Sequence, residues 1–250
     1  MPPGGSHLKL ARELAPKLAH ASLTAEPGAY YLGATSPDIR ALTKWDRRDT
    51  HFFDLTCFEE QHGKDGLFSA HPELADARQL DESTVAFMCG YISHLEMDET
   101  WITDIYRPCF GERSPLKGDL IANLLDRVLQ HELDQRDMQE RDATSEIHRQ
   151  IVETAADVAV SFLERATLLR WREVTAERLS DPPDWERFSL FVSRHLRPFG
   201  VESQADIAHF LENIPDLIDQ SIREVTPERI EAFQQDSRRR ALDAIREYLS

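Results

Sequence analysis

The stretch FMCGYISHLEMDETW, residues 87–101, decides the fold class, because its apolar side chains recur at helical spacing. One stripe of the expected helix carries Phe87, Tyr91, His94 and Asp98. A carboxylate on a buried stripe is costly unless it has a partner. Two interpretations stay open: Asp98 accepts a hydrogen bond from His94, or both side chains bind a cation.

The same helical patterning extends over most of the chain and predicts an all-α fold. Residues 81–83 provide acidic and capping side chains at the start of a helix over 81–106. Ser6 is the expected cap of the first helix, and Pro215 is expected to kink or split a later one. Further helices are expected over 7–18, 117–141, 144–178, 184–196, 203–222 and 226–249.

The segment 25–56 is rich in Pro, Gly, Ser and Thr and is expected to be mostly loop. A connection of that length is rarely idle in a compact domain. It is therefore expected to be functional or internally braced.

Composition narrows the class of partner. With 29 Lys and Arg against 45 Asp and Glu, the net charge is -16, which disfavours nucleic acid and anionic membranes as partners. The N-terminus has no apolar core of signal-peptide length, and no window reaches the roughly 18–20 apolar residues of a membrane span. We expect a cytoplasmic protein without stable membrane insertion, with Cys57, Cys89 and Cys109 as reduced thiols.

Three further residues strengthen the cation interpretation of His94 and Asp98. Asp38 lies in GATSPDI, His51 lies in THFFDL, and His7 begins the first helix. Each also has an ordinary alternative: Asp38 as a helix cap, His51 as a surface residue, and His7 as a helix-start residue. Carboxylate oxygens together with imidazoles suit zinc, with manganese or iron as competitors.

In series, the motifs SHLKLA, YYLGATSPDI, THFFDL and FMCGYISHLEMDETW resemble the zinc-dependent phospholipase C family. The wider superfamily includes the fungal single-strand-specific nucleases. The resemblance covers roughly residues 5–110. It implies an all-α, multi-helix bundle of the zinc-dependent phospholipase C type, with up to three zinc ions at the base of a cleft and, here, extra C-terminal helices.

The resemblance also implies roles for single residues. It places Asp38, His51, His94 and Asp98 around one zinc ion and gives Asp38 a catalytic role in orienting or deprotonating water. Asp98 would bridge to a second ion that His7 also holds.

The sequence departs from the family at two of its zinc sites. At one, the N-terminal Trp of the secreted members is missing. At the other, the family has a His soon after the HxxxD element and then an HxxxE pair, but no His occurs here between His94 and His131, and Gln135 stands four residues after His131 where the pair would place Glu. His131 nevertheless lies on the apolar side of its helix and is kept as a candidate ligand. Side chains that could stack on a substrate, with core packing as the alternative, are Tyr31, Phe52 and Tyr91.

The resulting expectation is a metal-dependent hydrolase of a phosphoric ester or diester with two or three zinc ions. Its substrate would be a small-molecule or lipid head-group phosphoester, and no nucleic acid. The alternatives are a non-hydrolytic descendant that uses a structural zinc as a binding or assembly module, and a biosynthetic tailoring enzyme that reuses the metal cluster. The Pro182-Pro183 break divides the chain into a metal-binding helical domain (1–180) and a C-terminal helical extension (181–250) expected to pack on it.

Overall fold

The computed structural model describes residues 2–59, 61–182, 184–189 and 204–250. Throughout these ranges the regular structure is helical, without a strand, so the predicted all-α class is confirmed. The expected helix over 184–196 is described only for residues 185–189, and the rest of it lies outside the described residues. No helix in the described ranges is both long and apolar enough to cross a membrane.

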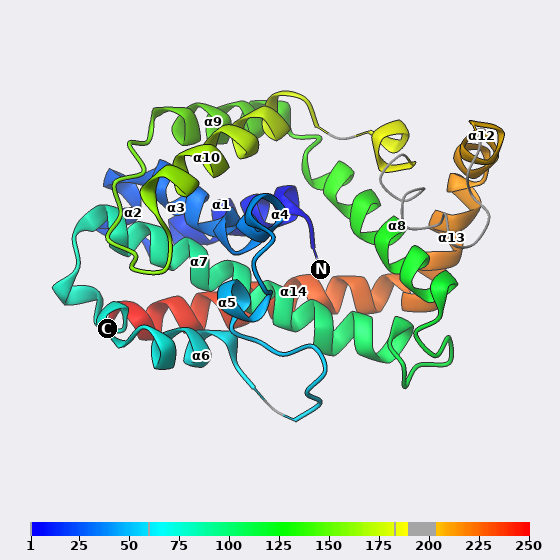
Figure 1. Ribbon diagram of the computed structural model, residues 1–250, viewed down its shortest axis with the longest axis horizontal. Helices are drawn as coiled ribbons and strands as arrows, with labels where there is room; N and C mark the ends of the chain where they lie inside the picture. The colour runs from blue at the N-terminus through cyan, green and yellow to red at the C-terminus, as the bar shows by residue number, and fades with distance from the viewer. Residues whose placement is uncertain (1, 60, 183, 190–203) are drawn as a thin grey trace.

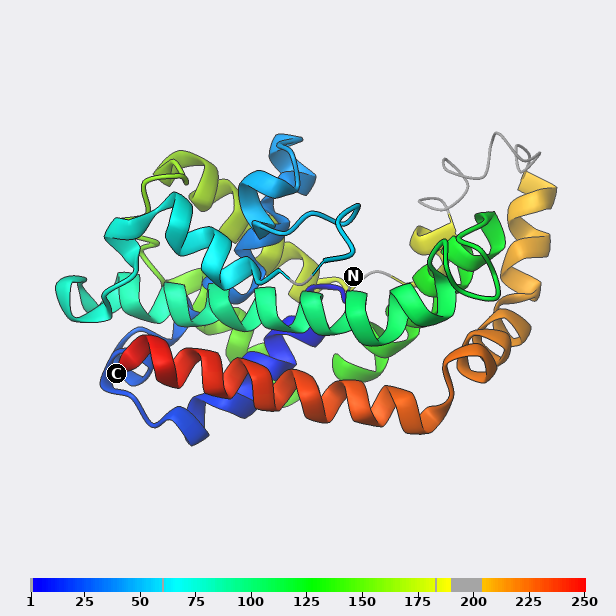
Figure 2. The same cartoon turned by 90° about the horizontal axis from the view of Figure 1, so that it is seen from below.

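A long helical rod forms the axis of the molecule. Helix α7 (Glu82–Thr100) continues without a break into the π-helical segment η4 (Trp101–Phe110). As predicted, Asp81 caps its start, and the carboxylate accepts the Thr84 N–H at 2.9 Å. Helix α14 (Pro227–Leu249) runs antiparallel along the rod, as Figures 1 and 2 show.

Helix α3 (Pro27–Thr35) crosses α7 at a pair of glycines. A Cβ atom on Gly33 would lie 2.0 Å from the Phe87 carbonyl oxygen, and one on Gly90 would lie 2.0 Å from the Tyr30 carbonyl oxygen. The two backbones therefore touch with no side chain between them. This close crossing brings the end of α3 within reach of the middle of α7.

The remaining helices pack around these elements (Figure 1). Helices α1 and α9 lie against α3, while α8 and α13 pair beside η4 at the other end of the rod. The longer of these helices are α1 (Gly4–Leu18), α6 (Gly63–Ala70), α8 (Leu120–Asp137), α9 (Arg141–Glu153), α10 (Arg165–Ser180), α12 (Gln204–Glu212) and α13 (Ile214–Val225). The short ones are α2 (Ala21–Ala25), η1 (Ser36–Ile39), α4 (Arg40–Thr43), α5 (Arg48–His51), η2 (Pro72–Leu74) and η3 (Ala77–Gln79).

One hydrophobic core joins these helices, from Leu8 in α1 to Tyr248 in α14. The C-terminal helix α14 therefore packs into the same core as α7. A smaller apolar cluster lies around Val128 and Phe188, beside α13.

Several predicted boundaries are wrong. The segment 25–56 is largely helical, because Pro27 and Pro37 each occupy the first turn of a helix, where a missing N–H costs nothing. Ser6 does not cap α1, which begins at Gly4. The Ser6 hydroxyl instead donates to the Asp137 carboxylate at 2.7 Å.

The helix expected over 144–178 is two helices, α9 and α10, separated by residues 154–164. Tertiary hydrogen bonds hold that connection. The Ala159 N–H donates to the Thr84 hydroxyl at 2.8 Å, and Arg172 donates to the Thr154 carbonyl at 2.7 Å. A separate helix, α6, occupies residues 63–70 and was not anticipated. Pro215 lies in the first turn of α13, which fits the expected split of the 203–222 helix.

The glycine crossing gives a stability prediction. Gly33→Ala should lower the free energy of unfolding by about 1–3 kcal/mol, because the new methyl meets backbone atoms that no rotamer change can move away. The higher helix propensity of alanine, worth about 1 kcal/mol, will not offset this. Urea unfolding followed by circular dichroism measures the change. Gly4→Ala is the control, since a Cβ there meets nothing within 4 Å. A Gly33→Ala variant as stable as the parent would show that the helices do not touch.

Candidate metal centre

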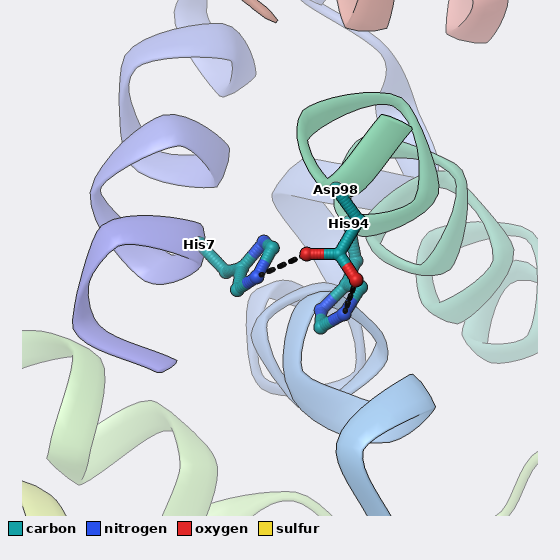
Figure 3. Close-up of side chains that lie close together, drawn as sticks. All are labelled: His7, His94 and Asp98. Atoms are coloured by element: carbon teal, nitrogen blue, oxygen red, sulfur yellow. Dashed lines mark ion pairs between the residues drawn. The ribbon is translucent and has the colours of Figure 1, made fainter. Parts of the chain in front are cut away.

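Side chains from four separate elements meet beside the α3–α7 crossing. They are His7 from α1, Asp38 from η1, His51 from the end of α5, and His94 and Asp98 from α7. Figure 3 shows His7 and His94 both close to the Asp98 carboxylate, one ring at each of its oxygens. The structure thus brings five of the candidate residues close together in space. All are buried except Asp38, whose side chain is 32% exposed.

His94 is turned so that its free nitrogen faces the cluster. Its Nδ1 lies 2.8 Å from the carbonyl oxygen of Ala34, at the end of α3. A carbonyl oxygen can only accept, so Nδ1 carries a proton, and in the neutral form of the ring Nε2 presents a lone pair. That Nε2 lies 3.7 Å from Asp98 Oδ2 and has no hydrogen-bond partner among the described residues. A simple His94–Asp98 hydrogen bond is therefore not what the pair forms.

His51 is oriented in a similar way by its neighbour. Its Nδ1 lies 2.9 Å from the Thr50 hydroxyl, which itself donates to the Arg47 carbonyl at 3.4 Å and so can accept from the ring. The Tyr91 hydroxyl donates to the Thr50 carbonyl and fixes this residue from the other side. His51 Nε2 then points at two carboxylates, 3.2 Å from Asp98 Oδ2 and 3.6 Å from Asp38 Oδ1, without a hydrogen bond within the described structure.

His7 differs from the other two imidazoles. Its Nε2 lies 3.0 Å from the Pro2 carbonyl oxygen and 3.4 Å from Asp98 Oδ1. The carbonyl places the proton on Nε2 and the lone pair on Nδ1, which is buried and unpartnered within the described ranges. The ring stacks on His94 with centroids 3.6 Å apart. His7 thus packs against the cluster more than it points a lone pair into it.

Arg47 was not anticipated from the sequence. Its Nη2 lies 2.9 Å from Asp98 Oδ2, and its Nη1 donates to the Phe53 carbonyl at 3.4 Å. The guanidinium supplies a fixed positive charge to the buried Asp98 carboxylate. No sequence signal separates Arg47 from its neighbour Arg48, which is exposed.

These charges shift the protonation equilibria of the cluster. Burial raises the pKa of Asp98, but the charge of His94 and the close polar contacts with His51 and His7 outweigh it and hold the pKa well below the usual range. Burial likewise raises the pKa of Asp38, and the close contact with His51 and the charge of His94 reverse the effect, so that the net pKa is low. Both carboxylates are ionised at neutral pH.

The two stacked imidazoles are shifted in opposite directions. Burial and the charge of His94 lower the pKa of His7. Burial also lowers the pKa of His94, but the negative charges of Asp98 and Asp38 outweigh it and raise the net pKa. The two carboxylates therefore favour a positive charge at His94 Nε2, which either a proton or a bound cation can supply.

The donor set fits a divalent cation. Buried atoms that point into the cluster without a hydrogen-bond partner among the described residues include His51 Nε2, His94 Nε2 and Asp98 Oδ1. Lone pairs that face ionised carboxylates in a buried site repel them unless a positive charge lies between. Two groups of side chains have the spacing to hold an ion: His7, His94 and Asp98, and Asp38, His51 and His94. Imidazole nitrogens with carboxylate oxygens are typical ligands of zinc, manganese and iron.

The structure does not bring His131 into either group. Its ring stacks on Phe188 with centroids 4.6 Å apart and meets Trp185 edge-on at 4.5 Å. Burial, together with the charge of Arg178, lowers its pKa to about 4. The helical pattern placed His131 correctly on an inward face, but that face meets aromatic rings.

The aromatic residues expected to stack on a substrate lie in the core instead. Tyr91 is fully buried, and Tyr31 is buried against α1 and α9, where the charges of Arg12 and Glu146 act on its hydroxyl. Phe52 packs edge-on against Phe162. Tyr91 serves the cluster indirectly, through its hydrogen bond to Thr50.

Two cavities border the cluster. A cavity of about 130 Å³ lies beside Asp38 and is lined mainly by apolar groups, with Trp171 and Arg178 among them. A larger one, of about 500 Å³, lies on the side of Arg47 and Trp101. The site therefore has space next to both its most exposed carboxylate and its arginine.

Comparison with protein-family models, with curated proteins and with solved structures finds no match to this chain. The resemblance to zinc-dependent phospholipases C therefore rests on the sequence motifs alone. The arguments for function come from the geometry of the site.

The placement of His131 predicts a pH effect on stability. The pKa of His131 in the folded protein is about 4, below the value of 6.5 for an unperturbed histidine. Between pH 6.5 and pH 4 the unfolded chain therefore binds more protons than the folded protein. The free energy of unfolding falls as the pH drops through this range. His131→Phe removes this titration. From pH 7 to pH 5, the free energy of unfolding should therefore fall by about 1–2 kcal/mol less in the variant than in the parent. Urea unfolding at both pH values measures the difference. Parallel losses in the two proteins would show that His131 is not held neutral.

Proposed function

We propose that this protein is a metal-dependent hydrolase of phosphoric esters. The observation that carries the proposal is the convergence of unpartnered imidazole nitrogens on two ionised carboxylates in a buried cluster. A divalent ion bound there would polarise a phosphoryl oxygen and bring the pKa of a bound water close to neutrality. The spacing of the sequence motifs agrees with this class of reaction.

Counting lone pairs favours one complete ion site. His94 offers a single free nitrogen, since its Nδ1 is taken by the Ala34 carbonyl, and that nitrogen can serve one ion at a time. We assign the ion to Asp38, His51, His94 and Asp98. His7 offers no lone pair for a second ion beside Asp98 Oδ1, because its Nε2 keeps the proton that faces the Pro2 carbonyl, and Arg47 already supplies one positive charge at Asp98 Oδ2.

Asp38 has a distinct part in this proposal. Its carboxylate is the most exposed of the donors, and it borders the 130 Å³ cavity. Its low pKa makes it a weak proton acceptor at neutral pH, so it suits the orientation of a water molecule better than full removal of its proton. Asp98, buried and paired with Arg47, would instead hold the site together.

A structural ion is the second candidate, and Arg47 is the observation that favours it. An arginine that neutralises a ligand carboxylate lowers the charge available to a cluster of several ions. A single, slowly exchanging ion without hydrolysis would fit a binding or assembly module. The ion count and its exchange rate separate this candidate from a catalytic site.

The proposal predicts the effect of removing one ligand. His94→Ala should lose the bound ion and all phosphoester hydrolysis, because the ring supplies a ligand that no neighbour replaces. Elemental mass spectrometry on protein purified without chelator measures the ion, and a screen of p-nitrophenyl phosphate mono- and diesters measures hydrolysis. His131→Phe is the matched control and should keep both. Full metal content in His94→Ala would refute the assignment, while a bound ion with no hydrolysis in the parent would favour the structural candidate.

A further inference from the structure

The 500 Å³ cavity beside Arg47 has an unusual charge. Its wall carries four arginines, Arg40, Arg47, Arg107 and Arg127, from α4, the turn before α5, η4 and α8. The acidic residues in the wall are Glu112 and Asp126. The cavity is therefore positive in a chain whose net charge is -16.

Asp98 balances the charge of Arg47, but the other three arginines have no carboxylate partner in the described structure. The guanidinium groups of Arg40 and Arg127 form no hydrogen bond or ion pair that the described structure records, and the buried Arg40 Nε has no hydrogen-bond partner there. Asp126 keeps its negative charge, but its oxygens are held by Trp101 Nε1–H at 3.0 Å and Gln130 Nε2–H at 2.7 Å and not by an arginine. Arginines left without carboxylates around one cavity provide forked donors for an anion.

Arg107 is held in place by contacts that leave its charge available. Its Nη2 donates to the carbonyls of Leu55 and Cys57, and its guanidinium lies over the Phe58 ring at 4.8 Å. Its Nε is buried and has no hydrogen-bond partner in the described ranges. Neutral carbonyls and an aromatic face orient this cation without cancelling it.

The cavity adjoins the candidate metal centre through Arg47. The same guanidinium that lines the cavity contacts Asp98 Oδ2 at 2.9 Å. Trp101, three residues after Asp98 on the same rod, lines the cavity as well. A molecule in the cavity therefore lies beside the cluster, and its volume is within the range of about 300–1,000 Å³ that small-molecule sites have.

We propose that this cavity binds an anionic small molecule, and that the substrate carries a negative group in addition to the phosphoester that reacts. The assignment of a phosphoester as the reacting group rests on the proposed function. The assignment of an anion site depends only on the residues that line the cavity. The choice excludes a choline head group as the occupant, because Arg40, Arg107 and Arg127, which have no carboxylate partner among the described residues, would repel its quaternary ammonium. The substrate class is a phosphorylated metabolite with at least two anionic groups.

Calorimetric titration tests the anion site apart from hydrolysis. The full chain is treated with chelator and desalted, and pyrophosphate and phosphocholine are titrated into it. Pyrophosphate should bind and phosphocholine should bind more weakly. Arg40→Gln and Arg127→Gln should each weaken pyrophosphate binding by about tenfold, the loss expected for one charge-assisted hydrogen bond.

Arg223→Gln is the matched control, because Arg223 is an exposed arginine on α13 that lies outside the cavity wall. It should leave the pyrophosphate Kd unchanged. Unfolding midpoints establish that each variant is folded, and the titrations are repeated on untreated protein. Absence of pyrophosphate binding, equal Kd values in the three variants, or tighter binding of phosphocholine would each overturn the inference. Absence of hydrolysis in the parent would refute the proposed function and leave the anion site standing.

Discussion

The direct contact between the backbones of α3 and α7 is the constraint on which the site depends. Gly33 and Gly90 allow the two helices to touch, and that contact brings the Ala34 carbonyl to His94 Nδ1. The carbonyl decides which ring nitrogen keeps its proton, so a packing contact in the core sets the chemistry of a side chain one helical turn away. A side chain at either glycine would move that carbonyl and release the ring.

The cluster also illustrates how a protein keeps charge in its interior. Asp98 is ionised and buried because Arg47 and three imidazoles surround it. Arg47 alone does not account for the arrangement, since the nitrogens of His51 and His94 face the carboxylates without forming hydrogen bonds within the described structure. The proposed cation and the arginine would share Asp98 Oδ2, because Arg47, His51 and His94 all approach that oxygen. This sharing, together with the single free nitrogen of His94, is why we propose fewer ions than the motifs implied.

The sequence predicted much of the site because its ligand residues lie in motifs with regular spacing. His94 and Asp98 share one helical stripe, and the motifs around Asp38 and His51 added candidates that the fold brings together. Arg47 could not be predicted, because burial distinguishes it from Arg48 and burial depends on tertiary packing. His131 shows the converse: periodicity places a residue on an inward face but does not identify what that face meets. For the same reason, the prediction of a loop over residues 25–56 from local composition was wrong. The prolines of this segment lie at the starts of helices and do not interrupt them.

The acidic surface acts differently on the two species that this site would receive. A net charge of -16 raises the local concentration of divalent cations and opposes the approach of anions. Arrival of the cation should therefore slow as salt is added, whereas arrival of an anionic metabolite at the arginine cavity should become faster until salt competes for the arginines themselves. The electrostatic field of the whole molecule would thus act in opposite directions on the arrival of the two species, far from any ligand atom.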